Sequence, residues 1–532
     1  MDRISFDGPV VLVVMDGVGL APGGPGNAIS NAHMPFLSKA ISSNYLRAKL
    51  EASGESVGLL KGVMGNSEVG HNTIGSGQII KSGIAAIEEA FDSGSIWQSE
   101  AWQGVINQIN THPGATLHFA GIFSDGAVHS DINQLEKMIK KAYDEGIRKI
   151  RVHCMFDGRD VPPQSEPKYI ERFELFAEKF LDADIKIASG GGRMTTTCDR
   201  YENDWGVVER GFNMMVHGIA QNTFHSATEA IAELRAKTPG IQDQYLPDFV
   251  IVDNSNNPIG KVSSGDAFVY FDFRADRAVE IATALSENDF TKFNRGNNFI
   301  TSEIYFAGLT EYQSDKHIPK NQLIKPNYIT HPLNEFLNSR QITELAVSET
   351  VKFGHITYYF NGNSYDESSL EKSIEIPSYT EPFNTRPWMK TAEITDAVLA
   401  NMDQYKFVKV NFPGGDMVGH FAEMDSCIIA MEAIDLALSE IAKKVDELGG
   451  CLIITADHGN VEELLDEHGE PKTAHSLNPV PFIIYDNTKN REHYSFSGVE
   501  HPGLANIAAT IAMLLGQNDY PEIWQKSLIV IK

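Results

Sequence analysis

The hydrophobic positions of this chain follow two patterns that alternate along most of its length. Short apolar runs of strand length, at residues 10–15 and 451–456, are typical of strands that a sheet buries on both faces. At residues 428–448 the hydrophobic positions instead recur every three or four residues, which predicts a helix that ends at Gly449 and Gly450. Because strand, loop and helix follow one another repeatedly, the pattern predicts an α/β protein with parallel sheets.

Acidic residues and histidines follow several of these strands. Asp16 comes directly after the strand at 10–15, and Asp457 and His458 come after the strand at 451–456. Ligands of open α/β sheets bind at the carboxyl ends of the strands, so these side chains lie where a site is expected. Asp416 and His420 follow another predicted strand, at residues 407–412. Their spacing of four residues puts both on one face of a helix, where they can chelate one ion.

Together with His475 from a later loop, these side chains have the carboxylate and imidazole groups that bind divalent metals. Each has an ordinary alternative. Asp416 and His420 can form a solvated surface pair, Asp16 or Asp457 can cap a turn or helix, and His475 can be a loop histidine. Since all six residues fall at strand ends or in turns, we favour a site for two divalent ions.

Residues 65–71, Gly-Asn-Ser-Glu-Val-Gly-His, place Ser67 on a glycine-flanked turn that opens a predicted helix. A hydroxyl beside free backbone N–H groups suits a nucleophile that carries a phosphoryl group. The serine needs activation, and two metal ions lower the pKa of a bound hydroxyl and stabilise charge on phosphate oxygens. The alternative is a structural turn with a capping serine. Given the metal candidates, phosphoryl transfer is the favoured interpretation.

The middle of the chain repeats the strand pattern with different chemistry. Predicted strands at 116–123, 149–156, 185–189 and 267–273 each lead into a loop rich in aspartate, glycine or arginine. Arginine binds carboxylate and phosphate through paired hydrogen bonds, so several such loops indicate a substrate with both groups. We predict a discontinuous metal-binding α/β domain (1–79 and 326–532) with a second α/β domain (80–325) inserted into it. Hinges are predicted at 75–83 and 308–326.

Composition narrows the class of protein. A chain of 532 residues favours two domains, and its formal net charge of −27 disfavours nucleic acids and acidic membranes as partners. The longest apolar runs have strand length, and the N-terminus lacks the pattern of a secretion signal. The four cysteines are scattered, which favours a reducing compartment and argues against a cysteine-ligated metal. We expect a cytoplasmic monomer that acts on a small molecule.

Long motifs along most of the chain resemble those of a known family. They are Met15-Asp16-Gly17, residues 65–71, Ser124-Asp125-Gly126 with His129-Ser130, Asp157-Gly158-Arg159-Asp160-Val161-Pro162-Pro163, Phe273-Arg274-Ala275-Asp276-Arg277, Asp416-Met417-Val418-Gly419-His420 and Ala456-Asp457-His458-Gly459-Asn460. The chain resembles the cofactor-independent (2,3-bisphosphoglycerate-independent) phosphoglycerate mutases of the alkaline phosphatase-like superfamily. Residues 190–205 look more like the plant and trypanosomatid branch than the commoner bacterial form.

The resemblance implies interconversion of 3-phosphoglycerate and 2-phosphoglycerate in glycolysis and gluconeogenesis, with no bisphosphoglycerate cofactor. It makes Ser67 the phosphorylated nucleophile and places Lys352 near the transferring phosphoryl group. One ion would be held by Asp16, Ser67, Asp457 and His458, and the other by Asp416, His420 and His475. The phosphoglycerate would be held by His129, Arg159, Asp160, Arg193, Arg200, Arg274 and Arg277. Carboxylates and imidazoles suit Mn²⁺, which we favour, and also Zn²⁺, Co²⁺ and Mg²⁺.

Two roles in this scheme have alternatives. Asp160 is the candidate general acid–base for the glycerate hydroxyls, or it forms an ion pair that orients Arg159. Lys352 stabilises charge on the phosphoryl group, or it is a surface lysine. The function also has alternatives. One is a metal-dependent phosphatase or phosphodiesterase of the same superfamily, which needs no inserted arginine-rich domain. The other is a catalytically inactive binding protein.

Overall fold

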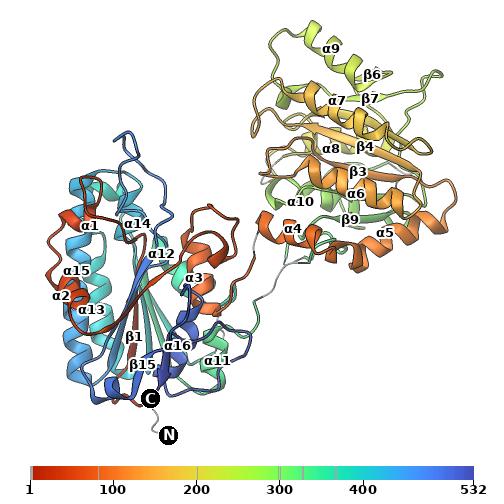
Figure 1. The fold of residues 1–532 in the computed structure, drawn as a ribbon. Coiled ribbons are helices and arrows are strands. Elements are labelled where there is room, and N and C mark those ends of the chain that lie inside the picture. Colours follow the sequence, from red (N-terminus) through yellow and green to blue (C-terminus); the bar gives the residue numbers. More distant parts are fainter. Residues whose placement is uncertain are drawn as a thin grey trace. The chain divides into compact units, whose positions relative to one another are not determined.

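The computed structural model of the chain describes residues 4–81, 83–199, 202–296, 299, 301–314, 316–325, 329–365 and 368–532. Arg200, one of the predicted substrate residues, lies outside the described residues. The chain forms two compact units (Figure 1). The first, here the terminal unit, comprises Met1–Ala85 and Asn327–Lys532, and the second, the central unit, comprises Ala86–Pro326. Each has a seven-stranded sheet with helices on both faces.

The sheet of the terminal unit has the strand order β11-β10-β12-β1-β13-β14-β2. β1 (Val10–Met15) lies between β12 (Phe407–Phe412) and β13 (Cys451–Thr455) and pairs in parallel with both. Every residue of β1 is buried, which confirms a strand covered on both faces. The other strands are β2 (Leu46–Leu50), β10 (Glu344–Glu349), β11 (Glu371–Ile376) and β14 (Val480–Tyr485), with β15 (Tyr494–Phe496) and β16 (Ile529–Ile531) in a separate pair.

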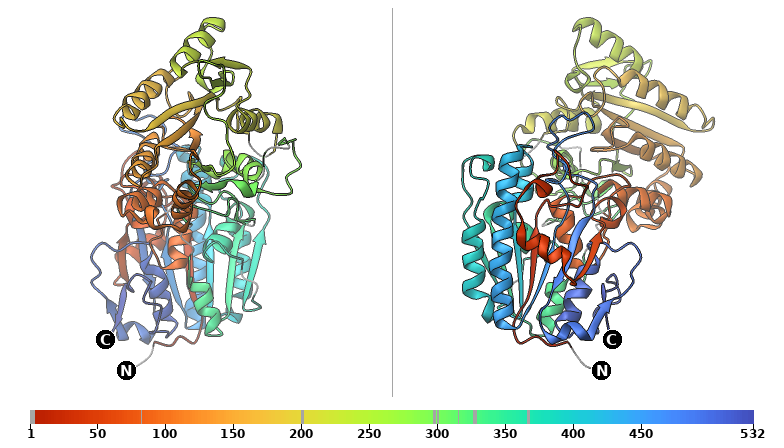
Figure 2. Two further views of the ribbon diagram at one scale, coloured as in Figure 1. Left: turned by 90° about the vertical axis from the view of Figure 1, so that its right-hand side faces the viewer. Right: turned by 60° about the vertical axis from the view of Figure 1, so that its left-hand side comes forward.

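Helices cover both faces of this sheet (Figures 1 and 2). On one face lie α15 (Met424–Leu448), α13 (Thr391–Asn401), α1 (Ala28–Asn31) and α2 (Pro35–Ser42), and on the other lie α3 (Ser67–Ser76), α11 (Leu333–Ser339) and α16 (Asn506–Leu514). The short helices α12 (Thr350–Gly354) and α14 (Gly414–Gly419) directly follow β10 and β12. The end of α15 is as predicted, because Gly449 caps it in the left-handed region with a φ of 70°.

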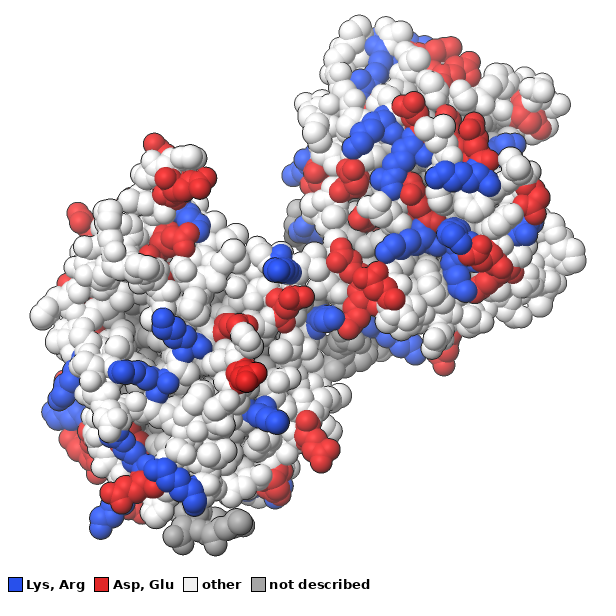
Figure 3. Space-filling view, viewed as in Figure 1, with Lys and Arg blue, Asp and Glu red and all other residues white. Residues whose placement is uncertain are grey.

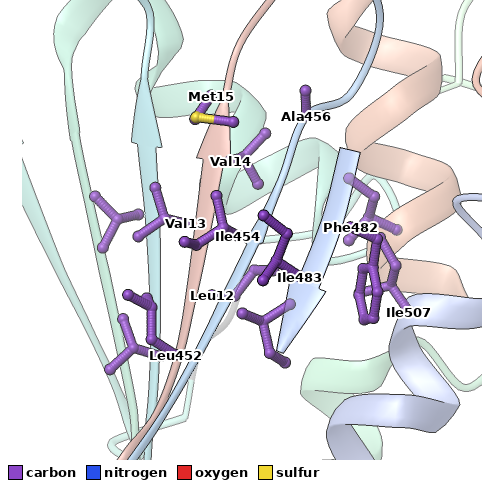
Figure 4. Packing of buried hydrophobic residues seen from close by; sticks show 14 of the residues in the cluster. Leu12, Val13, Val14, Met15, Leu452, Ile454, Ala456, Phe482, Ile483 and Ile507 are labelled. Carbon is purple, nitrogen blue, oxygen red and sulfur yellow. The ribbon is translucent and has the colours of Figure 1, made fainter. Parts of the chain in front are cut away.

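The core of the terminal unit lies between the central strands and these helices. Val13 of β1, Ile454 of β13 and Ile483 of β14 pack in layers along the sheet, and Ile507 of α16 lies beside Phe482 (Figure 4). Each of these side chains is at most 2% exposed. Burial of one aliphatic side chain of this size contributes about 1.5–3 kcal/mol. The core therefore holds the ends of the central strands in a fixed arrangement.

The sheet of the central unit has the strand order β6-β7-β5-β4-β3-β8-β9. β3 (Leu117–Ile122) pairs in parallel with β4 (Lys149–Phe156) and β8 (Ala267–Tyr270), and β4 pairs in parallel with β5 (Asp184–Gly192). The remaining strands are β6 (Asn222–Phe224), β7 (Phe249–Ile251) and β9 (Tyr305–Gly308).

Two separate apolar cores flank the central sheet. One face packs against α4 (Gly83–Asp92), α5 (Glu100–Thr111), α6 (Ile132–Asp144), α7 (Glu166–Ala177) and α9 (Ala227–Lys237). The other face packs against α8 (Trp205–Phe212) and α10 (Val279–Ser286). Apolar side chains therefore cover both faces of this sheet. The polar groups of interest lie beyond the carboxyl ends of its strands.

The glycines at 190–192 belong to β5, whereas the sequence prediction placed them in the loop after the strand. A Cβ at Gly190 would lie 2.8 Å from the ring of Phe249, and a Cβ at Gly192 would lie 2.4 Å from the backbone of Gln244. Neighbouring segments thus approach so closely that only glycine fits, and the strand continues through them.

Gly75 and Gly77 open the predicted hinge segment 75–83, and both lie in the terminal unit. Gly75 lies in the last turn of α3, where an added Cβ would be 1.9 Å from the carbonyl oxygen of Phe360. Gly77 caps α3 with a φ of 68° and packs against Trp524. Both positions require glycine for close approach within the terminal unit. Gly308, the first residue of the other predicted hinge segment, is the last residue of β9.

Charged side chains are spread over the surface. On the face shown in Figure 3, acidic and basic side chains are interspersed on both units instead of gathering in one basic area. Within the described residues, no helix has both the length and the apolar character needed to cross a membrane.

Candidate active site

The terminal sheet brings four predicted site residues to one edge. Asp16 follows β1, Asp457 follows β13, Asp416 lies in the helix after β12, and Lys352 lies in the helix after β10. These strands are neighbours and run in parallel. Their carboxyl ends therefore meet, although the residues are far apart in the sequence.

The first group of ligand candidates is Asp16, Asp457 and His458, whose ligand atoms lie within 4.8 Å of one another. All three side chains are fully buried. Ser67, the first residue of α3, directs its Oγ into this group, 3.1 Å from Asp16 Oδ1 and 3.0 Å from His458 Nε2. Asn66 caps the helix by accepting a hydrogen bond from the N–H of Val69, which leaves the Ser67 hydroxyl free for the site.

The second group is Asp416, His420 and His475. Asp416 Oδ1 lies 2.9 Å from His475 Nε2 and 3.2 Å from His420 Nε2. Asp416 lies in α14, and His420, four residues later, is the C-cap of that helix. Their side chains therefore lie on one helix face, as predicted. The His420 side chain is 45% exposed, so this group opens toward solvent while the first group is buried.

The orientation of the histidines fits metal binding. His420 Nδ1 lies 2.8 Å from the carbonyl oxygen of Thr473, and His475 Nδ1 lies 2.8 Å from that of Gly65. A carbonyl oxygen only accepts, so each Nδ1 carries a proton, and it is the Nε2 of each ring that faces the group. The two Nε2 atoms lie 3.3 Å apart. Two imidazole lone pairs and a carboxylate at this spacing are a donor set for a divalent cation.

Lys352 lies at the junction of the two groups. Its Nζ is 3.0 Å from Asp16 Oδ1 and 2.6 Å from Asp416 Oδ2, and it also donates to Ser67 Oγ. The side chain is only 5% exposed, so the alternative of a surface lysine is wrong. Burial lowers the pKa of Lys352, but the charges of Asp16 and Asp416 outweigh burial and raise it above its ordinary value.

The carboxylates of the site stay ionised. Burial raises the pKa of Asp416, but hydrogen bonds from His420 and His475 and the charge of Lys352 hold it well below its ordinary value. For His458, burial lowers the pKa, whereas Asp457 and Asp16 raise it to about 9. A cation that binds His458 Nε2 must therefore displace a proton.

Two residues outside the predicted set hold the first group in place. Asn411, inside β12, donates from Nδ2 to Asp16 Oδ2 at 2.8 Å and lies 3.0 Å from His71 Nε2. His71 Nδ1 lies 2.8 Å from the carbonyl oxygen of Ser67 and 3.2 Å from Asp457 Oδ2. The sequence signal for Asn411 was an asparagine within a predicted buried strand.

The central unit gathers a second set of predicted residues at the carboxyl ends of its strands. Arg193, directly after β5, is 1% exposed and donates from Nη1 to Asp157 Oδ1 at 2.7 Å and to Asp160 Oδ2 at 2.5 Å. His129 Nε2 lies 3.8 Å from Asp160 Oδ2. Asp160 therefore pairs with Arg193, and the described residues contain no ion pair between Asp160 and Arg159. The alternative in which Asp160 forms an ion pair that orients Arg159 is therefore wrong.

The other predicted arginines lie around this pair. Arg274 is half-exposed and lies 3.3 Å from Asp276 Oδ1, which in turn is 3.5 Å from His129 Nδ1. Arg277 is buried and donates to the carbonyl oxygen of Cys198 at 2.7 Å. Arg159 is exposed on the loop after β4.

Charge around His129 keeps its ring neutral at pH 7. Burial and the charge of Arg193 lower the pKa of His129 to about 4, against the opposing effect of Asp276 and Asp160. A neutral ring can donate one hydrogen bond and accept another. Asp157 and Asp276 were absent from the predicted site, although both stood in the motifs used for the resemblance. Their role is to fix the arginine and histidine side chains.

Comparison with known proteins defines the class. The model of the Metalloenzyme superfamily matches residues 8–519. This match and the α/β fold, with its two acidic-histidine groups, define a member of the Metalloenzyme superfamily.

Relatives define the family. The chain is 42% identical to the protein named "Probable 2,3-bisphosphoglycerate-independent phosphoglycerate mutase" of Leptospira interrogans, with 98% of this chain and 97% of the relative aligned. It is 38% identical to the 2,3-bisphosphoglycerate-independent phosphoglycerate mutase of Trypanosoma brucei brucei, covering 98% and 97%. A structure of Leishmania mexicana phosphoglycerate mutase at low cobalt concentration matches with a TM-score of 0.62 at 37% identity, covering 100% and 99%. The chain belongs to the 2,3-bisphosphoglycerate-independent phosphoglycerate mutases, as the motifs predicted.

Proposed function

We propose that this chain interconverts 3-phosphoglycerate and 2-phosphoglycerate through a phosphoserine on Ser67, without 2,3-bisphosphoglycerate, in glycolysis and gluconeogenesis. The observation that carries the proposal is the position of Ser67 Oγ. It lies within hydrogen-bond distance of Asp16 and His458, and Lys352 donates to it. A hydroxyl among carboxylate, imidazole and ammonium groups suits a nucleophile that receives a phosphoryl group.

The residues present fit two divalent ions. Asp16, Ser67, Asp457 and His458 would hold one, and Asp416, His420 and His475 would hold the other. When bound, the ions would lower the pKa of the serine hydroxyl and neutralise charge on the phosphoryl oxygens. Mn²⁺ suits this set of carboxylates and imidazoles best, with Co²⁺, Zn²⁺ and Mg²⁺ as alternatives.

In the first half of the reaction, Ser67 Oγ loses its proton and attacks the phosphorus. The bond between phosphorus and the glycerate oxygen breaks, and that oxygen takes up a proton. Lys352 is placed to stabilise the charge of the transferring group, because its ammonium contacts Ser67 and is held by two carboxylates. A fixed, buried cation needs little reorganisation during the transfer.

In the second half, the other glycerate hydroxyl loses its proton and takes the phosphoryl group from Ser67, whose Oγ is protonated again. We assign the proton transfers at the glycerate to Asp160. Its carboxylate is 18% exposed and fixed by Arg193, so it can reach a bound ligand while keeping its orientation.

The glycerate must stay bound between the two halves. Arg193, Arg274 and Arg277 offer forked donors for carboxylate and phosphate, and neutral His129 offers one more hydrogen bond. We include Arg159 on the same strand edge. Of these residues, Ser67 belongs to the terminal unit and Arg193 to the central unit.

The deciding experiment supplies purified protein and Mn²⁺ with 3-phosphoglycerate alone and measures 2-phosphoglycerate and free phosphate together. We expect the isomer with little phosphate, and no turnover by Ser67→Ala. Stoichiometric phosphate without the isomer would instead establish the phosphatase alternative. No product of either kind from a metal-loaded, folded protein would favour an inactive binding protein.

We further propose that the protein is a monomer in the cytoplasm. Each unit has its own apolar core, and all four cysteines, each within the described residues, are free thiols. Light scattering after gel filtration tests the first point, and cell fractionation tests the second.

A further inference from the structure

Glu462 is a buried acid that the proposed reaction does not use. It lies four residues beyond His458 and is 2% exposed. Its Oε2 accepts hydrogen bonds from the N–H groups of Gly19 at 2.8 Å and Asn460 at 2.9 Å. Its Oε1 accepts from Ser476 Oγ and, at 3.1 Å, from Asn478 Nδ2. Each carboxylate oxygen therefore accepts two hydrogen bonds, and all four donors are neutral. Within the described residues, Glu462 forms no ion pair.

The donors to Glu462 come from the segments that carry the metal-ligand candidates. Gly19 follows Asp16 by three residues, Asn460 follows His458 by two, and Ser476 follows His475 directly. The carboxylate thus connects two segments of the first ligand group to the loop that supplies the second group. No other single side chain described above bonds to all three segments.

The backbone is built around this carboxylate. A Cβ added at Gly19 or at Gly459 would lie 2.3 Å from Glu462 Oε1. Both glycines therefore allow the chain to approach the acid more closely than any side chain would permit. Backbone bonds join the same segments, from Val461 N to Gly17 O at 3.2 Å and from Ser476 N to Gly459 O at 3.0 Å. The hydrogen bonds to Glu462 thus add side-chain connections to segments that backbone hydrogen bonds already join.

We propose that Glu462 is a positioning residue that couples the two ligand groups, so that both depend on it for metal affinity. The inference rests on the proposed two-ion site. Groups that orient metal ligands typically contribute about 10–100-fold to metal affinity. A carboxylate is needed because four donors converge on it. The amide of glutamine would turn its own N–H₂ toward two of them and leave those contacts unmade.

The test measures Mn²⁺ binding to metal-free protein by calorimetry, before any assay of activity. We expect Glu462→Gln to bind both ions about 10–100-fold more weakly than the wild type. Turnover should recover toward the wild-type rate at saturating Mn²⁺, because Glu462 contacts neither substrate nor reacting atoms. The matched control is Glu463→Gln. The Glu463 side chain also accepts from Asn478 Nδ2, at 2.8 Å, but it is 40% exposed, and within the described residues it accepts from none of the other three donors to Glu462.

Several outcomes separate the possible failures. If wild-type protein binds no metal, the proposed metal site is wrong. A second outcome is that the wild type binds two ions and Glu462→Gln binds them equally well but has a lower melting temperature. Glu462 would then only stabilise the fold, and the inference would be overturned. If Glu462→Gln does not fold, Ser476→Ala replaces it, since this change removes one donor of the Oε1 pair. Unchanged Mn²⁺ affinity in Ser476→Ala would then overturn the inference as well.

Discussion

The ammonium of Lys352 lies 2.6 Å from the carboxylate of Asp416, and 3.0 Å from that of Asp16. It thereby contacts one member of each group of metal-ligand candidates while donating to Ser67, the proposed nucleophile. A single buried cation at this junction is placed to act on charge that develops on a transferring group.

We expect Lys352→Met to lower kcat by about a hundredfold or more, the cost of removing one preorganised charge donor. Binding of Mn²⁺ to the metal-free variant should not weaken, because all the ligand side chains remain. Steady-state kinetics at saturating Mn²⁺ and calorimetry measure the two quantities. Lys352→Arg, which keeps the charge, is the control. An unchanged kcat in Lys352→Met would contradict the assigned role.

Metal removal should abolish activity. Asp416 is 3% exposed and accepts hydrogen bonds from both histidines of its group, so it would be the central oxygen ligand of the proposed second ion. Chelated protein should regain turnover when Mn²⁺ is added back. Asp416→Asn should bind one ion fewer, with circular dichroism like that of the wild type. Elemental analysis gives the ion count. Full turnover by protein shown to be metal-free would exclude the two-ion site.

Arg193→Met should destabilise the central unit, because it leaves Asp157 and Asp160 without the buried cation that contacts both. Removing one partner of a buried ion pair costs about 3–5 kcal/mol. Arg193→Lys keeps the charge but loses the planar fork, so it should unfold closer to the wild type and still show a raised KM for 3-phosphoglycerate. Urea unfolding and initial rates measure these effects. A normal KM in Arg193→Lys would remove Arg193 from the substrate site.

Two buried histidines should make the stability of the central unit depend on pH. His118 Nδ1 lies 3.0 Å from His153 Nε2, and Ser189 Oγ lies 2.7 Å from His153 Nδ1. Burial lowers the pKa of both rings below their ordinary value of 6.5. In the unfolded chain these two rings therefore take up protons as the pH falls through 6.5, whereas in the folded chain they do so only at lower pH. The contribution of these two neutral rings to the stability of the folded chain is therefore present above pH 6.5 and is lost progressively below it.

The measurement compares thermal unfolding at pH 7.5 and 5.5, chosen about one unit to either side of the free imidazole pKa. Wild type and His153→Gln are both studied without metal, so that the metal ligands contribute equally to each. We expect the wild type to lose more stability than His153→Gln on acidification. Equal losses would show that the pair does not carry the effect.

Much of the fold was predictable because it depends on local patterns. Residues 10–15 and 407–412 form the predicted strands, since an apolar run needs burial on both faces. Asp16, Asp416 and Asp457 could be expected at one edge, because parallel neighbouring strands end together. The glycines at 190–192 could not be placed by the same reasoning. Their conformation depends on the close approach of Phe249, which is distant in the sequence.

The sequence by itself determined which residues can do chemistry: a serine at the start of a helix, carboxylates and histidines after strands, and arginines in a separate segment. These features follow from residue type and short-range spacing. Tertiary structure alone decided that Lys352 is buried between the ligand groups, that Asp160 pairs with Arg193, and that Glu462 connects three loops. Such contacts join residues far apart in the chain, and only packing of the strands and loops brings their polar atoms within hydrogen-bond distance.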